Sequence, residues 1–140
     1  MIRLVFALRR KPHLRRAQFQ EYWLNQHAPL VAGFSTDLQI MRYVQTHTLD
    51  DQSNSAAQQA RGDMEAEYDG VAELWWSSER DLADQSSSAA LKASAALLED
   101  EKTFIDLENS PIWFAYEYPQ INPAPETIIA SPKSNIVRVF

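Results

Sequence analysis

The sequence predicts an α+β fold whose elements follow the order β-α-β-β-α-β. The first observation is a set of four short segments rich in branched and aromatic residues, which are typical of strands: residues 2–8, 39–48, 69–77 and 112–118. The second is a pair of longer segments with apolar residues at helical spacing, residues 15–30 and 86–101. This order is the ferredoxin-like arrangement, in which two helices cover one face of a four-stranded antiparallel sheet.

The first predicted helix carries an unusual stripe. Phe19, Trp23 and His27 follow one another at steps of four and therefore share one helix face. Pro29 interrupts the pattern two residues after the histidine. Because proline has no backbone N–H, a carbonyl near Asn25 loses its usual helical partner. The stripe thus places a titratable ring on an apolar face beside a helix-breaking residue.

The later elements are less regular. The polar connection over residues 49–67 exceeds the usual length, and we expect a mobile segment with a short helix in its SAAQQA stretch. The helix over residues 86–101 places three apolar residues on one face: Leu91, Ala95 and Leu98. Acidic residues crowd its C-terminal end, where the helix dipole disfavours them. Either Lys102 relieves this misfit or the acidic cluster marks a site.

We expect one domain over residues 1–119 and a C-terminal extension over residues 120–140. A chain of 140 residues fits a single domain with a real hydrophobic core. Three prolines stop the last strand of that domain: Pro119, Pro123 and Pro125. The final IVRVF alternates like a strand, so the extension is predicted to add one.

The third and fourth predicted strands are apolar on both faces. Val71 and Trp75 alternate with Ala72 and Leu74, and the segment over residues 112–118 shows the same pattern. A sheet that is apolar on both faces is buried on both faces. Two helices cover one face, and a second copy packed sheet to sheet would cover the other. The pattern therefore predicts a symmetric homodimer.

Charge and hydropathy exclude several classes of partner. The net charge of −6 gives no reason to expect nucleic acid. No apolar run approaches the roughly 18 residues that a membrane span requires, so we expect no membrane partner. The basic cluster RRKPHLRR, residues 9–16, is either a solvated loop and helix start or an anion-binding patch.

The residue inventory also limits the chemistry. The chain has no cysteine, which excludes disulfides, thiolate catalysis and zinc–thiolate sites. It has only three glycines and no glycine-rich loop for a nucleotide. The three histidines lack metal-ligand spacing, so we expect neither a metal nor a cofactor. The chain opens with an apolar stretch followed by basic residues, the reverse of a secretory leader, and we expect a cytoplasmic protein.

Two stretches carry a specific pattern. The first is K-P-x-L followed by F-x-x-Y-W-x-x-x-H-A-P-L-V, between Lys11 and Val31; the second is YDGVAELWW, residues 68–76. With DEKTFID at residues 100–106, this pattern resembles the EthD family of dimeric α/β-barrel proteins, over roughly residues 1–119. Arg15 and Gln18 stand where the family places Ser or Thr and then Glu, so the capping box of the first helix is degraded.

The resemblance implies a ferredoxin-like subunit that dimerises through its sheets and holds a pocket between sheet and helices. EthD-like proteins occur in the degradation of ethers and other xenobiotics. Relatives of the same architecture act as polyketide cyclases, decarboxylases, dehydratases, lactone isomerases or cofactor-free monooxygenases. The founding group is associated with an oxidative ether-cleaving system. An oxidoreductase activity would come from oxygen chemistry on an activated substrate.

His27 is the candidate catalytic residue, because a neutral imidazole accepts a proton near pH 7. Its position on the Phe19–Trp23 face directs it toward the sheet. The alternative is a structural role, in which the ring donates a hydrogen bond to the carbonyl freed by Pro29.

The candidate substrate-binding residues are mostly aromatic: Tyr22, Trp23, Tyr43, Trp75, Trp76 and Asp106. Core packing is the alternative for Tyr22 and Trp23, and a place at the dimer seam is the alternative for Tyr43. Tyr43 and His47 point to one face of their strand. His13 is expected to be exposed in the basic loop. Asp106 either accepts a hydrogen bond from Tyr22 or His27 or caps a turn.

Two carboxylates in apolar strands need partners, because an unpaired buried charge is costly. These are Glu73, for which Arg42 is a plausible mate, and Glu117. Structural pairing is favoured over a role as acid or base.

Two classes of function follow. The first is an enzyme or enzyme-accessory protein that acts on a small hydrophobic, oxygenated or aromatic metabolite. It would use cofactor-independent acid/base chemistry, as a cyclase, dehydratase, decarboxylase, isomerase or oxygenase-associated protein, with His27 in the pocket. The second is a binding or stress-response barrel that holds a small ligand without turnover.

Overall fold

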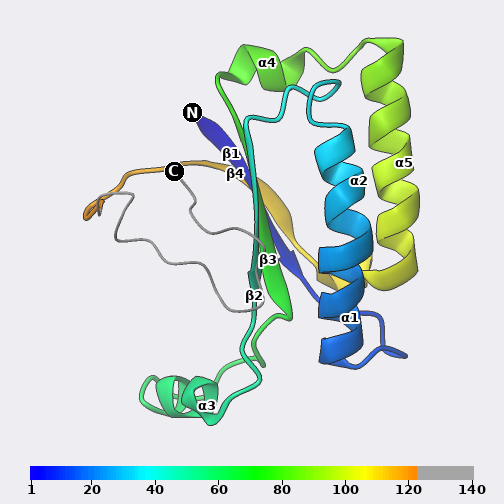
Figure 1. Cartoon of the computed structure of the whole chain (residues 1–140). Helices are drawn as coiled ribbons and strands as arrows, with labels where there is room; N and C mark the ends of the chain where they lie inside the picture. Colours follow the sequence, from blue (N-terminus) through cyan, green and yellow to red (C-terminus); the bar gives the residue numbers. More distant parts are fainter. Residues whose placement is uncertain (123–140) are drawn as a thin grey trace.

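The structure is a computed structural model that describes residues 1–122, and Figure 1 shows a sheet with its main helices on one face. The strands are β1 (Ile2–Leu8), β2 (Arg42–His47), β3 (Gly70–Trp76) and β4 (Ile112–Tyr116). The helices are α1 (Arg16–Tyr22), α2 (Ala28–Gly33), α3 (Gln52–Gln59), α4 (Glu79–Ala83) and α5 (Ser88–Phe104). A π-helical turn, Trp23–His27, joins α1 to α2, and a 3₁₀ turn, Leu107–Asn109, precedes β4.

The strand order in the sheet is β2-β3-β1-β4, and every neighbouring pair is antiparallel. The two central strands, β1 and β3, are therefore the first and third in sequence. Figure 1 shows α1, α2 and α5 on one face of this sheet. The predicted ferredoxin-like α+β fold is confirmed, whereas the strand predicted near the C-terminus lies outside the described residues.

The first helix accommodates Pro29 by widening its backbone rather than by breaking. The Ala28 N–H bonds to the Trp23 carbonyl, five residues back, which defines the π turn. The helix then continues to Gly33, three residues beyond the predicted end. At its start, the Arg15 N–H donates to the Gln18 side chain at 2.9 Å, so one half of the capping box survives.

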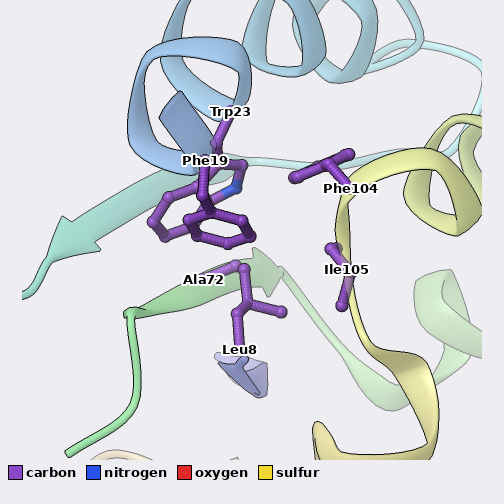
Figure 2. Close-up of a cluster of buried hydrophobic side chains, with 6 residues drawn as sticks. All are labelled: Leu8, Phe19, Trp23, Ala72, Phe104 and Ile105. Carbon is purple, nitrogen blue, oxygen red and sulfur yellow. The ribbon is translucent and has the colours of Figure 1, made fainter. Parts of the chain in front are cut away.

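The main hydrophobic cluster lies between this helix, the sheet and the end of α5 (Figure 2). It is formed by six buried residues: Leu8, Phe19, Trp23, Ala72, Phe104 and Ile105. The Phe19 ring lies 5.6 Å from the Trp23 ring and 5.5 Å from the Phe104 ring, centroid to centroid. Burial of each large side chain contributes about 1.5–3 kcal/mol, so this cluster fixes where the π turn lies over the sheet.

Gly70 allows the close approach of helix and sheet. A Cβ at this position would lie 2.4 Å from Cζ3 of Trp23 and 2.8 Å from the carbonyl oxygen of Thr46. A side chain of any size would therefore push the indole ring, and the π turn that carries it, away from β3.

Several elements differ from the prediction. The connection over residues 49–67 contains α3, which is longer than the predicted SAAQQA helix, and α4 was not predicted at all. In α5, the buried face carries Ala90, Ala93 and Phe104, with Leu97 packed nearby, whereas Leu91 and Leu98 are exposed. The predicted stripe of that helix was thus wrong by one residue, because a second apolar stripe one position earlier is the one that packs inward, with Leu38 and the main hydrophobic cluster.

The basic cluster is tied to an internal carboxylate. Asp69, only 3% exposed, accepts hydrogen bonds from the Arg10 backbone N–H at 2.8 Å and from Nε of Arg16 at 2.9 Å. The Arg10 guanidinium also pairs with this carboxylate. Arg9 lies over the Tyr68 ring and bonds to the carbonyl of Ala66. These arginines join the start of α1 to the start of β3. The expected loop and helix start is therefore present, with His13 and Arg15 exposed, but Arg10 and Arg16 are paired within the chain.

The opposite sheet face is more polar than expected. Glu73 pairs with Arg3 at 2.6 Å, and Glu117 accepts a hydrogen bond from Nε1 of Trp75 at 2.6 Å. The predicted structural pairing of both carboxylates is therefore confirmed, but the mate of Glu73 is Arg3 and not Arg42. The Arg42 guanidinium instead lies over the Trp75 ring.

Strand β4 leaves four large side chains exposed: Ile112, Trp113, Phe114 and Tyr116. Among the residues that the structure describes, no helix combines the length and the apolar composition needed to cross a bilayer.

Candidate functional site

A cavity of about 300 Å³ lies between the helix-covered face of the sheet and the helices. Its walls are mainly apolar and include Leu4, Phe6 and Leu74. Its polar lining residues come from several elements: His27, Tyr43, Gln85, Ser94 and Glu101. No lysine or arginine is among its described lining residues. A mostly apolar hollow with a few convergent polar groups is the usual form of a small-molecule site, and this one is at the small end of the range.

His27, the last residue of the π turn, lies on the cavity wall. Its side chain is 7% exposed, and its ring packs 5.1 Å from the Phe104 ring. Nδ1 of the ring lies 2.7 Å from Oδ2 of Asp100 on α5. The imidazole therefore bonds to a carboxylate, which corrects the alternative that the freed carbonyl near Pro29 is its acceptor.

Asp100 binds two side chains at once. Its Oδ1 accepts a hydrogen bond from the Tyr22 hydroxyl at 2.5 Å, while its Oδ2 faces Nδ1 of His27. An ionised carboxylate only accepts hydrogen bonds, so the proton of the neutral imidazole is on Nδ1. Nε2 of His27 is then a lone-pair acceptor, as a general base requires.

Nε2 of His27, on a residue that lines the cavity, makes no hydrogen bond within the described residues. Among those residues, the only buried side-chain nitrogen or oxygen without a partner is Nε of Arg3. The Nε2 atom is therefore unpaired but accessible, which is the state of a group that is ready to meet a ligand.

The surroundings keep this imidazole neutral. Burial lowers the pKa of His27 below its ordinary value of 6.5, and the hydrogen bond and charge of Asp100 oppose that shift. Asp100 also raises the pKa of Tyr22, first through their hydrogen bond, so the phenol keeps its proton. At neutral pH the group thus combines a neutral base, a carboxylate that orients it and a phenol that orients the carboxylate.

A second titratable group, Glu101, lies on the same cavity wall. Burial, and secondly the charge of the adjacent Asp100, raise the pKa of Glu101 to about 7. This carboxyl is divided between its protonated and ionised forms at neutral pH. The cavity therefore contains a neutral imidazole beside a carboxylic acid that exchanges its proton near neutral pH.

The structure brings four of the predicted site residues to the cavity: Trp23, His27, Tyr43 and Trp76. Tyr22 lies behind His27, on the shared carboxylate. Two others lie elsewhere. Trp75 points to the opposite sheet face, where it bonds to Glu117. Asp106 caps the 3₁₀ turn, and its carboxylate accepts from the Asn109 side chain, so the acceptor shared by Tyr22 and His27 is Asp100 and not Asp106.

Sequence reasoning missed Asp100 and Glu101 as site residues. The signal was the acidic crowding at the C-terminal end of the second long helix. Lys102 offsets this crowding of negative charge only at Glu99, to which it bonds at 2.8 Å. The two remaining acidic residues, Asp100 and Glu101, lie at the site. His47 stacks on Trp23 with 4.5 Å between centroids, and His13 is exposed.

Two other features bear on the choice of site. Residues 1–122 contain no group of three or more His, Asp or Glu side chains that could hold a metal ion. A wider surface depression of about 530 Å³ lies beside Arg9, Tyr68 and Asn109. Arg9 is already paired there with Glu65, and neither His27 nor Glu101 reaches it, so we assign the site to the cavity between sheet and helices.

Comparisons with known proteins agree with this architecture. The structure is similar to that of an EthD family protein from Bacillus halodurans, with a TM-score of 0.54 and 16% identity, over 84% of this chain and 100% of that chain. It is also similar to an EthD-like protein from Ralstonia eutropha, with a TM-score of 0.52 and 14% identity, over 81% and 88% of the two chains. No protein of curated function matches the sequence. The family model of the EthD domain matches residues 11–108, and the chain therefore belongs to the EthD family.

Proposed function

We propose that this protein binds a small, hydrophobic, oxygenated or aromatic metabolite in its cavity and catalyses proton transfer on it without a bound cofactor. His27 is the general base and acid, and Trp23, Tyr43 and Trp76 form the walls. The observation that carries the proposal is the bond between Nδ1 of His27 and Asp100 at 2.7 Å, which leaves the Nε2 lone pair of this cavity-lining residue without a partner among the described residues.

The reaction class follows from these groups. Nε2 of His27 takes a proton from a carbon next to a carbonyl, and the electron pair of the broken C–H bond moves into the carbonyl to form an enolate. The imidazolium, stabilised by Asp100, then returns a proton to carbon or delivers it to a leaving hydroxyl. Cyclisation, dehydration, decarboxylation and lactone isomerisation all use such steps, in catabolic or secondary metabolism.

A model ketone tests this activity directly. The probe is 2-tetralone in D₂O, and NMR follows the replacement of its α-protons by deuterium. We expect the protein to accelerate exchange over buffer, and His27→Gln to reduce that acceleration by about 10²-fold or more. His13→Gln, in the exposed loop, is the matched control and should exchange as the native protein does.

The result also separates the two classes of function. Equal exchange by the native protein and His27→Gln would refute His27 as the acid/base group. Binding of 2-tetralone by the native protein, with no exchange above buffer, would instead favour a barrel that holds a ligand without turnover. A fold check by circular dichroism accompanies each variant.

We further propose that the protein is a cytoplasmic homodimer that pairs through its sheets. The exposed Trp113 on β4 supports this proposal, because its register beside Val5 places it on the sheet face that the helices leave open. Light scattering coupled to size-exclusion chromatography tests the assembly. We expect twice the chain mass of 16.0 kDa, and a shift toward the single-chain mass in Trp113→Glu. Cell fractionation tests the location.

A further inference from the structure

Tyr43 differs from the other polar residues of the cavity in how its hydroxyl is held. It lies on the helix-covered side of β2, where its pairing partner across the sheet is Leu74 of the cavity wall. Its hydroxyl oxygen accepts a hydrogen bond from Nε2 of Gln45 at 2.7 Å. Among the residues that the structure describes, no acceptor is bonded to the proton of this hydroxyl.

The direction of that hydrogen bond is settled by a backbone group. The same Gln45 amide nitrogen donates to the Trp23 carbonyl oxygen at 2.9 Å. A carbonyl oxygen is an acceptor only, so the amide must present its NH₂ group, and not its oxygen, to this side. Gln45 is therefore a donor to Tyr43, and the hydroxyl must direct its own proton elsewhere.

His47 holds the other end of the Gln45 amide. Its Nε2 lies 2.8 Å from Oε1 of Gln45, which makes Nε2–H the donor. The His47 ring is itself stacked on Trp23, with 18° between the ring planes. His47, Gln45 and Tyr43 thus form a line along one face of β2, in which each donor faces the next acceptor and the last proton has no acceptor among the described residues.

We propose that Tyr43 donates a hydrogen bond to an oxygen of the ligand, a ketone, ester or phenolic oxygen, and that the cavity selects a ligand with no ionised group. The proposal rests on the proposed function, since it places the carbonyl whose neighbouring proton His27 removes. Of the reactions named there it keeps cyclisation, dehydration and lactone isomerisation and sets aside decarboxylation, whose substrate carries an ionised carboxylate. Donation to the carbonyl oxygen would strengthen as negative charge develops there in the enolate.

Two properties of the site support the proposed ligand class. Burial raises the pKa of Tyr43 to about 12, against hydrogen bonds from the Gln45 and Trp23 side chains that lower it, so this phenol donates and does not act as a base. The described cavity lining contains no lysine or arginine, while it does contain Glu101. A ligand carboxylate would therefore enter an apolar space without a countercharge, which is costly.

Three probes of the same shape test the inference by equilibrium dialysis: 2-tetralone, tetralin and tetralin-2-carboxylate. They carry a ketone oxygen, no oxygen and an ionised carboxylate, respectively. We expect 2-tetralone to bind about threefold to tenfold more tightly than tetralin, the usual contribution of one hydrogen bond, and the carboxylate to bind most weakly. Tyr43→Phe should remove the preference for the ketone while the affinity for tetralin stays unchanged.

Gln45→Met tests the positioning role of the amide. We expect the ketone preference to fall in this variant while tetralin still binds, a ratio that a general loss of packing would not change. The variant also keeps the inference testable if Tyr43→Phe does not fold. His27→Gln should lose proton exchange but keep the ketone preference, so the two proposals fail separately.

Four outcomes would overturn the inference. They are equal binding of 2-tetralone and tetralin by the native protein, a ketone preference that survives in Tyr43→Phe, loss of that preference in His27→Gln instead, and carboxylate binding as tight as that of the ketone. Failure of all three probes to bind would overturn the proposed cavity function together with it.

Discussion

Replacement of Gly70 by alanine tests how the helix is held over the sheet. The added Cβ would lie 2.4 Å from Cζ3 of Trp23, 2.8 Å from its Cη2 and 2.8 Å from the Thr46 carbonyl oxygen. Optimal carbon–carbon contacts are about 3.5–4.0 Å, so the overlap with the indole exceeds about 1 Å. Neither neighbour yields easily, because Thr46 belongs to the β2–β3 ladder and Trp23 is 1% exposed.

We expect Gly70→Ala to lower the free energy of unfolding by about 1–3 kcal/mol, the usual cost of overpacking. Urea denaturation followed by far-ultraviolet circular dichroism measures it. Gly33→Ala is the matched control, because a Cβ there meets nothing within 4 Å. In that helical position alanine should be neutral or stabilising by up to about 1 kcal/mol.

A double-mutant cycle with Trp23→Phe isolates the cause. Cζ3 and Cη2 belong to the part of the indole that phenylalanine lacks, so the penalty of Gly70→Ala should be smaller in the Trp23→Phe background. The expected coupling is about 0.5–3 kcal/mol in favour of the double variant. Additive effects, or a Gly70→Ala protein as stable as the native one, would refute the close approach described above.

Three further predictions concern buried charge and proton binding. Asp69→Asn should lower the free energy of unfolding by about 3 kcal/mol in urea denaturation, because it leaves half-buried guanidinium groups without their carboxylate. In the control, Asp50→Asn, the side chain is 95% exposed, and the change should be less than about 0.5 kcal/mol. Similar values for both variants would contradict the role of Asp69. Because the pKa of Glu101 is raised from 4.5 to about 7 on folding, the stability that its proton contributes is fully present below pH 4.5 and is lost as the pH rises through 7. The fall in unfolding free energy between pH 5 and pH 8 should therefore be smaller in Glu101→Gln than in the native protein, by roughly 2–3 kcal/mol. An equal fall in both proteins would contradict this assignment. The pKa of His27 is lowered on folding, so the stability that the neutral ring contributes is present above pH 6.5 and is lost as the pH falls. Nitrogen-15 NMR should show a neutral ring protonated on Nδ1, with a pKa below 6.5 that falls further in Asp100→Asn. A proton on Nε2 would contradict the proposed base.

The fold was predictable because it depends on local patterns that repeat along the chain. The stripe of Phe19, Trp23 and His27 places the imidazole against the sheet without any knowledge of the partner strand. Alternation along β3 separated Trp75 from Trp76. It did not say which set faces the helices, because both sets are apolar, and the structure assigns only Trp76 to the cavity.

The site was predictable only in part, because its acidic half depends on the rotational phase of α5. That helix offers two apolar stripes, one through Leu91 and Leu98 and one through Ala90, Leu97 and Phe104. The second stripe packs inward and carries Glu101 to the cavity wall with it. A partner 73 residues away in sequence, as Asp100 is from His27, leaves no local signal beyond the acidic crowding at the helix end.

The π turn contains one residue more than a regular helical turn would need. The wider turn completes its circle with that extra residue, so the segments on either side of it keep the phase of one continuous α-helix. Deletion of Leu24, Asn25 or Gln26 would restore regular winding and leave the imidazole seven residues after Phe19, about two turns of 3.6 residues along the same face. A single-codon deletion here is therefore a change that natural or laboratory evolution can make while the hydrophobic anchor and the imidazole keep their places.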